Sequence, residues 1–187
     1  MARTKQAGAW TYEDLFALPD DGKRYEIIEG ELYEMPAPGS AHALAIMNLL
    51  QMLFPSVAKF GGQLLTAPLD VFFAGANPVQ PDILVILPGS LARVVPRGVE
   101  GPPDLLIEVI SPSNRVHDVF TKRALYARAG IREYWIVDPE ARTLDILTLD
   151  RDAFHLAVKA AGSEMPISPL LGQLSVAVDD LFPTFSE

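Results

Sequence analysis

Residues 104–110 read Asp-Leu-Leu-Ile-Glu-Val-Ile, and no other part of the sequence indicates the architecture as clearly. Side chains alternate between the two faces of a strand, so Glu108 shares one face with Leu106 and Ile110. A strand that is apolar on both faces is typical of the buried centre of a sheet. Glu108 is then an ionisable group in apolar surroundings, where it costs roughly several kcal/mol unless it is paired or bound to a metal.

Asp82 is a second ionisable group in apolar surroundings, at the start of another apolar stretch. It follows Pro81 and precedes the run Ile-Leu-Val-Ile-Leu at 83–87. Two carboxylates at the ends of neighbouring strands can converge and bind a hard divalent cation such as Mg²⁺, which fills its shell with water and phosphate oxygens. Alternatively, Asp82 caps a turn and Glu108 pairs with a core arginine. Because costly buried charges cluster at functional sites, the pair together favours a metal site.

A helix predicted at 116–129 follows the Glu108 strand directly. In this helix Asp118, Lys122 and Tyr126 lie at i, i+4 and i+8 and therefore share one face. Lys122 can reach the carboxylates, where it would orient the attacking water or stabilise the developing oxyanion. The alternative is an ordinary surface pair between Asp118 and Lys122.

The other elements are predicted from periodicity and from turn residues. They are a helix at 10–18, a hairpin at 24–35, a helix at 40–54 that Pro55 ends or kinks, strands at 64–73, 80–87, 104–110 and 133–137, a hairpin at 143–149 and 154–160, a short strand near 176 and a turn at 179–182. This order predicts an α/β fold in which helices flank a mixed sheet. We expect one domain over 1–187, with a core at about 40–138, an N-terminal helix and hairpin at 10–35, and a C-terminal hairpin and tail at 142–187.

Composition restricts the classes of function. The 187 residues contain no cysteine, which excludes disulfides, thiolate metal sites and a cysteine nucleophile. No apolar stretch follows the first eight residues, and runs such as 83–87 are only strand-sized, so we expect a soluble cytoplasmic protein without a membrane span. A net charge of −9 is unusual for a general nucleic-acid binder, so any nucleic-acid site must be local.

Several stretches together resemble a bacterial restriction-endonuclease family of the PD-(D/E)XK nuclease superfamily. The resemblance runs from about residue 10 to residue 149. The stretches that carry it are Tyr-Glu-Ile-Ile-Glu-Gly-Glu-Leu at 25–32, Gln-Pro-Asp at 80–82, Gly-Pro-Pro-Asp-Leu-Leu-Ile-Glu-Val-Ile-Ser-Pro at 101–112, Asp118 with Lys122 and Tyr126, and Gly-Ile-Arg-Glu-Tyr-Trp-Ile-Val-Asp-Pro at 130–139.

The resemblance implies a restriction-endonuclease-like fold in which Asp82 and Glu108 bind Mg²⁺ or Mn²⁺. The chain departs from the superfamily motif at Ile110, where a lysine is expected, and the resemblance implies that Lys122 on the next helix replaces it. His42 occupies a position at which relatives carry a histidine. The alternative is that His42, at the start of a helix, has a structural role. Further candidates for lining the cleft are Glu29, Glu31, Asp118 and Tyr126.

The main functional hypothesis is a metal-dependent endonuclease that hydrolyses phosphodiester bonds in DNA. The alternative is a protein with a nuclease fold that lacks catalysis and serves as a binding or structural module. Ile110, at the position of the expected lysine, and the net charge of −9 favour this alternative. A metal-free acid/base hydrolase is a weaker hypothesis, since no Gly-x-Ser-x-Gly motif is present. We also expect a homo-oligomer, most simply a dimer, because the terminal hairpin and apolar tail offer edges for a second subunit to cover.

Overall fold

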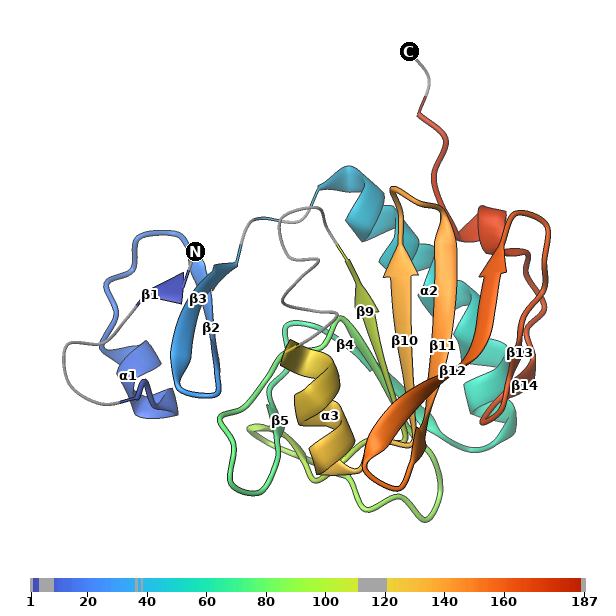
Figure 1. Cartoon of the computed structure of the whole chain (residues 1–187). Helices are drawn as coiled ribbons and strands as arrows, with labels where there is room; N and C mark the ends of the chain where they lie inside the picture. Colours follow the sequence, from blue (N-terminus) through green and yellow to red (C-terminus); the bar gives the residue numbers. More distant parts are fainter. Residues whose placement is uncertain (1, 4–8, 36, 38, 111–120, 186–187) are drawn as a thin grey trace.

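A six-stranded mixed sheet forms the centre of the protein (Figure 1). The computed structural model describes residues 2–3, 9–35, 37, 39–110 and 121–185. In spatial order the strands are β12 (Ala153–Ala161), β11 (Thr143–Asp150), β10 (Glu133–Asp138), β9 (Leu105–Val109), β6 (Ile83–Ile86) and β4 (Gln63–Thr66). β9 and β10 pair in parallel, whereas the other neighbours are antiparallel. The predicted α/β fold with a mixed sheet is therefore confirmed.

The strand that carries Glu108 lies in the middle of this sheet. All five residues of β9 are buried, as the apolar pattern on both faces predicted. Leu105, Ile107 and Val109 face one core, and Leu106 and Ile110 face the other. Glu108 follows the alternation of Leu106 and Ile110, so its side chain enters the second of these cores.

Helix α2 (Ser40–Lys59) covers the first face of the sheet (Figure 1). Its inward residues recur at helical spacing and pack against the strands, namely Ala45, Leu49, Met52, Leu53 and Val57. The helix continues one turn beyond Pro55, so the prediction that it ends near residue 54 is wrong. Pro55 is exposed, while the added turn buries Val57 to 2% exposure, which compensates for the missing N–H of the proline.

By length and composition, α2 also qualifies as a membrane-spanning helix, the one such helix in the described part of the chain. Its most apolar window of 18 residues has a mean hydropathy of 1.4. This is weak evidence, because a core helix of a soluble protein passes the same test.

Helix α3 (Arg123–Ala129) covers the opposite face as part of the crossover between β9 and β10 (Figure 1). Leu125, Tyr126 and Ala127 are buried against the second core. The helix ends at Gly130, whose φ of 84° is the left-handed conformation predicted for this position. Residues 116–120 of the predicted helix lie outside the described residues.

The N-terminal part contains the predicted helix and hairpin. α1 (Tyr12–Phe16) precedes β2 (Arg24–Ile28) and β3 (Glu31–Met35), which pair around a turn at Glu29 and Gly30, and β1 (Ala2–Arg3) adds to the free edge of β3. Glu29 and Gly30 both have positive φ, as a tight hairpin turn requires.

The predicted strand at 64–73 is instead two strands, β4 and β5 (Val71–Phe72). Pro68 lies between them and has no N–H to donate to a ladder, which the prediction overlooked. β5 pairs with a hairpin for which no strand was predicted, formed by β7 (Arg93–Val95) and β8 (Gly98–Glu100).

The C-terminal tail packs into the first core. It forms β13 (Ile167–Ser168), β14 (Gly172–Gln173) and the short helix η2 (Val178–Leu181) at the predicted turn, and no strand forms at residue 176. Five of its apolar side chains are buried there, namely Leu171, Leu174, Val178, Leu181 and Phe182, whereas Met165, Ile167 and Phe185 are exposed. Most of the tail therefore belongs to the core, and β12 of the terminal hairpin forms an edge of the sheet.

Candidate active site

The register between β6 and β9 places Asp82 and Glu108 opposite each other. Ile83 pairs with Ile107 and Leu84 with Leu106, so continuing the antiparallel register by one residue aligns Asp82 with Glu108. Directly opposed residues of an antiparallel pair project from the same face, with Cβ atoms about 4.5–5.5 Å apart. The main-chain N–H of Val109, the residue after Glu108, donates to Asp82 Oδ2 at 2.8 Å. The two carboxylates therefore project from the same face of the sheet at the end of β6.

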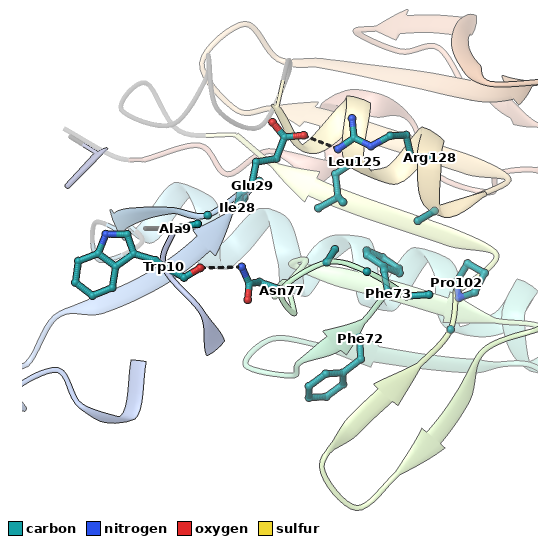
Figure 2. A pocket seen from close by; sticks show the side chains of 16 residues that line it. Ala9, Trp10, Ile28, Glu29, Phe72, Phe73, Asn77, Pro102, Leu125 and Arg128 are labelled. Atoms are coloured by element: carbon teal, nitrogen blue, oxygen red, sulfur yellow. Dashed lines mark hydrogen bonds and ion pairs between the residues drawn. The ribbon is translucent and has the colours of Figure 1, made fainter. Parts of the chain in front are cut away.

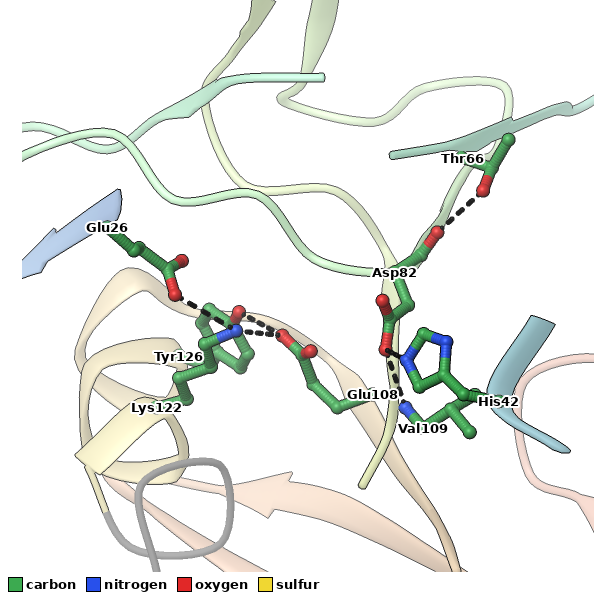
Figure 3. Close-up of polar contacts among 8 residues, drawn as sticks. All are labelled: Glu26, His42, Thr66, Asp82, Glu108, Val109, Lys122 and Tyr126. Carbon is green, nitrogen blue, oxygen red and sulfur yellow. Dashed lines mark hydrogen bonds and ion pairs between the residues drawn. The ribbon is translucent and has the colours of Figure 1, made fainter. Parts of the chain in front are cut away.

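Asp82 is held at the partly open side of this site. Its Oδ2 lies 3.2 Å from His42 Nε2, and both side chains are 18% exposed. His42 belongs to the first turn of α2, so the helix on one face of the sheet reaches the carboxylate at the strand end (Figure 3). The predicted candidate His42 is thus brought to the site. Its Nδ1 is buried and has no hydrogen-bond partner among the described residues.

Glu108 is held at the closed side of the site by two groups from the α3 segment. Lys122 Nζ donates to Glu108 Oε1 at 3.1 Å, and Tyr126 Oη donates to the same oxygen at 2.6 Å. All three side chains are at least 96% buried. Figure 3 shows the Glu108 carboxylate with the Lys122 ammonium on one side and Asp82 on the other. The helical spacing of Lys122 and Tyr126 predicted this shared face.

Glu26 on β2 is a third buried charge at this site, and the sequence pattern did not single it out. Its Oε2 lies 3.4 Å from Lys122 Nζ, and its Oε1 accepts the main-chain N–H of Gln80 at 3.2 Å. Oε2 is buried and accepts no hydrogen bond from the described residues, among which the lysine is its ion-pair partner. The signal was present in the hairpin, because Glu26 and Ile28 alternate onto the same strand face and Ile28 is buried.

Burial sets the ionisation state of the tyrosine in this cluster. Desolvation, followed by the charges of Glu108 and Glu26, raises the pKa of Tyr126 well above its usual value of about 10. The phenol is therefore protonated at neutral pH and serves as a hydrogen-bond donor to Glu108. Lys122 lies between the carboxylates of Glu26 and Glu108 and pairs with both.

Two further predicted candidates, Glu29 and Glu31, do not join the cluster. Glu29 is 54% exposed and pairs with Arg128, while Glu31 is exposed and accepts a hydrogen bond from Tyr33. Both belong to the hairpin turn, where glutamates are commonly solvated. Asp118 lies outside the described residues.

The residues present fit a hard divalent cation. Among the described residues no three side chains of the metal-binding types converge, so the site offers a pair of carboxylates. Mg²⁺ needs only one or two protein carboxylates, since water and phosphate oxygens complete its shell. The carboxylates of Asp82 and Glu108 supply the hard oxygen ligands that such a cation prefers. Asp82 and Glu108 would hold it.

Comparison with a solved structure defines the class of fold. The crystal structure of a putative nuclease belonging to DUF820 from Anabaena variabilis ATCC 29413 superposes with a TM-score of 0.71, covering 92% of this chain and 97% of that chain. The two sequences are 19% identical, so this likeness shows the fold: a mixed α/β nuclease fold.

The family follows from the sequence itself. The model of the Uma2 family, described as "Putative restriction endonuclease", matches residues 12–179, and the chain belongs to this family. The resemblance to a restriction-endonuclease family is thereby confirmed. No curated protein matches the chain.

Proposed function

We propose that this protein is a metal-dependent endonuclease that hydrolyses phosphodiester bonds in DNA, with Mg²⁺ or Mn²⁺ bound by Asp82 and Glu108. The observation that carries the proposal is the cross-strand pair of carboxylates beside a buried lysine. Membership of a family described as restriction endonucleases supports the reaction class. A cytoplasmic location and a homodimer remain predictions.

The reaction joins a water oxygen to phosphorus, breaks the bond from phosphorus to a sugar oxygen, and passes a proton from the water to the leaving oxygen. A divalent cation, when bound, lowers the pKa of its water and neutralises phosphate charge. Lys122 supplies a fixed positive charge for the phosphate oxygens as negative charge develops. Its ammonium needs little reorganisation because Glu26 and Glu108 already hold it.

The hydrogen bonds around the two carboxylates fix their positions. The Val109 N–H and the His42 ring hold one oxygen of Asp82, while Tyr126 and Lys122 hold Oε1 of Glu108. Partners of this kind orient metal-binding groups and are needed for full affinity. Tyr126 and His42 are therefore positioning residues in this mechanism.

Cleavage of DNA by matched variants tests the proposal. Purified wild type, Asp82→Asn and Glu108→Gln are incubated with supercoiled and linear DNA in Mg²⁺, in Mn²⁺ and in EDTA. We expect metal-dependent nicking by the wild type and a loss of at least about 100-fold in both variants, as for loss of a catalytic electrostatic group. Asp145→Asn is the control, because Asp145 lies on β11, two strands from β9, and pairs with Lys159 of β12.

Cleavage that persists in Asp82→Asn and Glu108→Gln would show a contaminating nuclease and would overturn the assignment. A non-catalytic module is the second candidate, and the closed Glu26–Lys122–Glu108 cluster with Ile110 in the motif favours it. Calorimetry distinguishes the two, since a module of that kind would show neither Mn²⁺ binding nor cleavage.

A further inference from the structure

A cavity separate from the carboxylate cluster lies between the N-terminal hairpin and the core (Figure 2). It has a volume of about 770 Å³. This is within the range of pockets that enclose small organic ligands, roughly 300–1,000 Å³. The chain segments that line it are the residues around Trp10, the β2–β3 turn, the loop after β5, the segment at 101–102 and one face of α3.

The inner wall of this cavity is apolar and partly aromatic. Ile28, Phe73 and Leu125 are all at most 7% exposed, and Phe72 and Trp10 also contribute to the lining. One face of the Phe72 ring is covered by Arg97, whose Cζ lies 4.2 Å from the ring centroid. A cavity of this size with an apolar, partly aromatic wall suits a planar ligand.

Polar groups are placed only at the rim. The Asn77 side chain donates to the Trp10 carbonyl at 3.3 Å, so its amide is fixed at the edge of the cavity. Arg128 is 57% exposed and pairs with Glu29, which is 54% exposed. An exposed pair of this kind contributes little to stability, so Arg128 can exchange the carboxylate for a phosphate at small cost.

The cavity and the candidate active site share helix α3. Lys122 immediately precedes α3, and Leu125 and Arg128 follow it by three and six residues. At about 1.5 Å per residue these positions lie about 4.5 and 9 Å further along the helix axis. Stacked nucleotides rise about 3.4 Å each, so this offset matches one to three nucleotides. Phe73 also contacts Tyr126 of the cluster, with ring centroids 6.1 Å apart.

We propose that this cavity binds a single unstacked nucleobase of the nucleic-acid strand, with the phosphate of the same nucleotide on Arg128. The proposal rests on the nuclease function proposed above and adds a recognition pocket next to the site of cleavage. The aromatic wall receives the face of the base, and the Asn77 amide reads its edge. Stacking on aromatic side chains is the usual way in which proteins hold unpaired bases.

Fluorescence titration tests this proposal without requiring cleavage. The chain has two tryptophans, of which Trp135 is fully buried and Trp10 lines the cavity. The probes are deoxyadenosine monophosphate, deoxyadenosine and a hexathymidylate strand, all in EDTA. We expect saturable quenching that disappears in Trp10→Phe and persists in Asp82→Asn, so that failure of the catalytic assignment leaves this result intact.

A pair of matched variants locates the binding. Ala129→Phe fills the cavity from α3, whereas Ala124→Phe adds the same ring on an exposed position of α3 that does not line it. We expect Ala129→Phe to weaken nucleotide binding by at least about 5-fold, the effect of losing one stacked base, and Ala124→Phe to leave it within 2-fold. Arg128→Ala should weaken binding of the monophosphate and not of the nucleoside.

Three results would overturn the proposal, provided that circular dichroism shows both phenylalanine variants to be folded. They are absence of saturable quenching by any of the probes, equal effects of Ala129→Phe and Ala124→Phe, and binding of an apolar dye that neither nucleotide nor strand displaces. The last would identify an apolar-ligand pocket instead.

Discussion

Replacing Lys122 by methionine removes the cation that pairs with both Glu26 and Glu108, and it keeps most of the side-chain volume. The lysine is 2% exposed and lies 3.1 Å from Glu108 and 3.4 Å from Glu26. At an effective dielectric constant of about 20, each contact contributes about 5 kcal/mol of Coulomb attraction. The desolvation of three buried charges offsets much of this gain, and breaking a buried pair costs about 3–5 kcal/mol in practice.

We therefore expect Lys122→Met to lower the free energy of unfolding by about 3–5 kcal/mol, measured by urea denaturation at pH 7.5. Glu26→Gln added to this variant should restore part of the loss, because it removes one of the two uncompensated carboxylates. Lys159→Met is the matched control, since Lys159 is 62% exposed and pairs with Asp145 at 3.4 Å, so it should cost less than about 1 kcal/mol. If both lysine variants lost equally little, or if Glu26→Gln made Lys122→Met worse, the electrostatic reasoning would be refuted.

Three other measurements probe the same region and the assembly. Burial raises the pKa of Tyr126, so the stability that the protonated phenol contributes is present below about pH 10 and is lost as the pH rises further. In urea titrations between pH 9 and 11, Tyr126→Phe should therefore lose less stability than the wild type, by up to about 1.4 kcal/mol per pH unit. An identical dependence of stability on pH in the two proteins would argue against this. His42→Ala should weaken Mn²⁺ binding about 10–100-fold by calorimetry, whereas the exposed His155→Ala should not, and equal effects would remove His42 from the site. Sedimentation equilibrium should give twice the 20.4 kDa chain mass, and a monomer would dismiss the predicted dimer.

The strands and the charged residues on them could be predicted because their sequence patterns are local. Alternation assigned Glu108 to one face of a buried strand, and the structure places it there. Helical spacing likewise predicted that Lys122 and Tyr126 share a face, and both reach the same oxygen of Glu108. Local periodicity therefore sufficed for the pair of carboxylates and for the lysine.

The missed parts of the site depend on contacts between distant segments. Glu26 joins the cluster because the N-terminal hairpin docks against α3, which no spacing within residues 24–35 reveals. Glu29 was chosen for its place beside the hairpin turn, yet the same docking turns it outward to Arg128. The alternation of Glu26 with buried Ile28 was the available signal, and it is the same signal that identified Glu108.

Turn and breaker residues misled the prediction where tertiary packing outweighed them. Pro55 does not end α2, because burial of Val57 compensates for the lost hydrogen bond. The tail was expected to offer an edge to a second subunit, but several of its apolar residues complete the core under α2. This contact joins segments that are distant in the sequence, so the order of the elements did not indicate it.

A crystal soaked in Mn²⁺ gives the most direct test of the metal site. The account predicts an anomalous peak within bonding distance of carboxylate oxygens from both Asp82 and Glu108, and none at the same place in Glu108→Gln. A soaked wild-type crystal with no peak there, or with its only peak elsewhere on the protein, would contradict it.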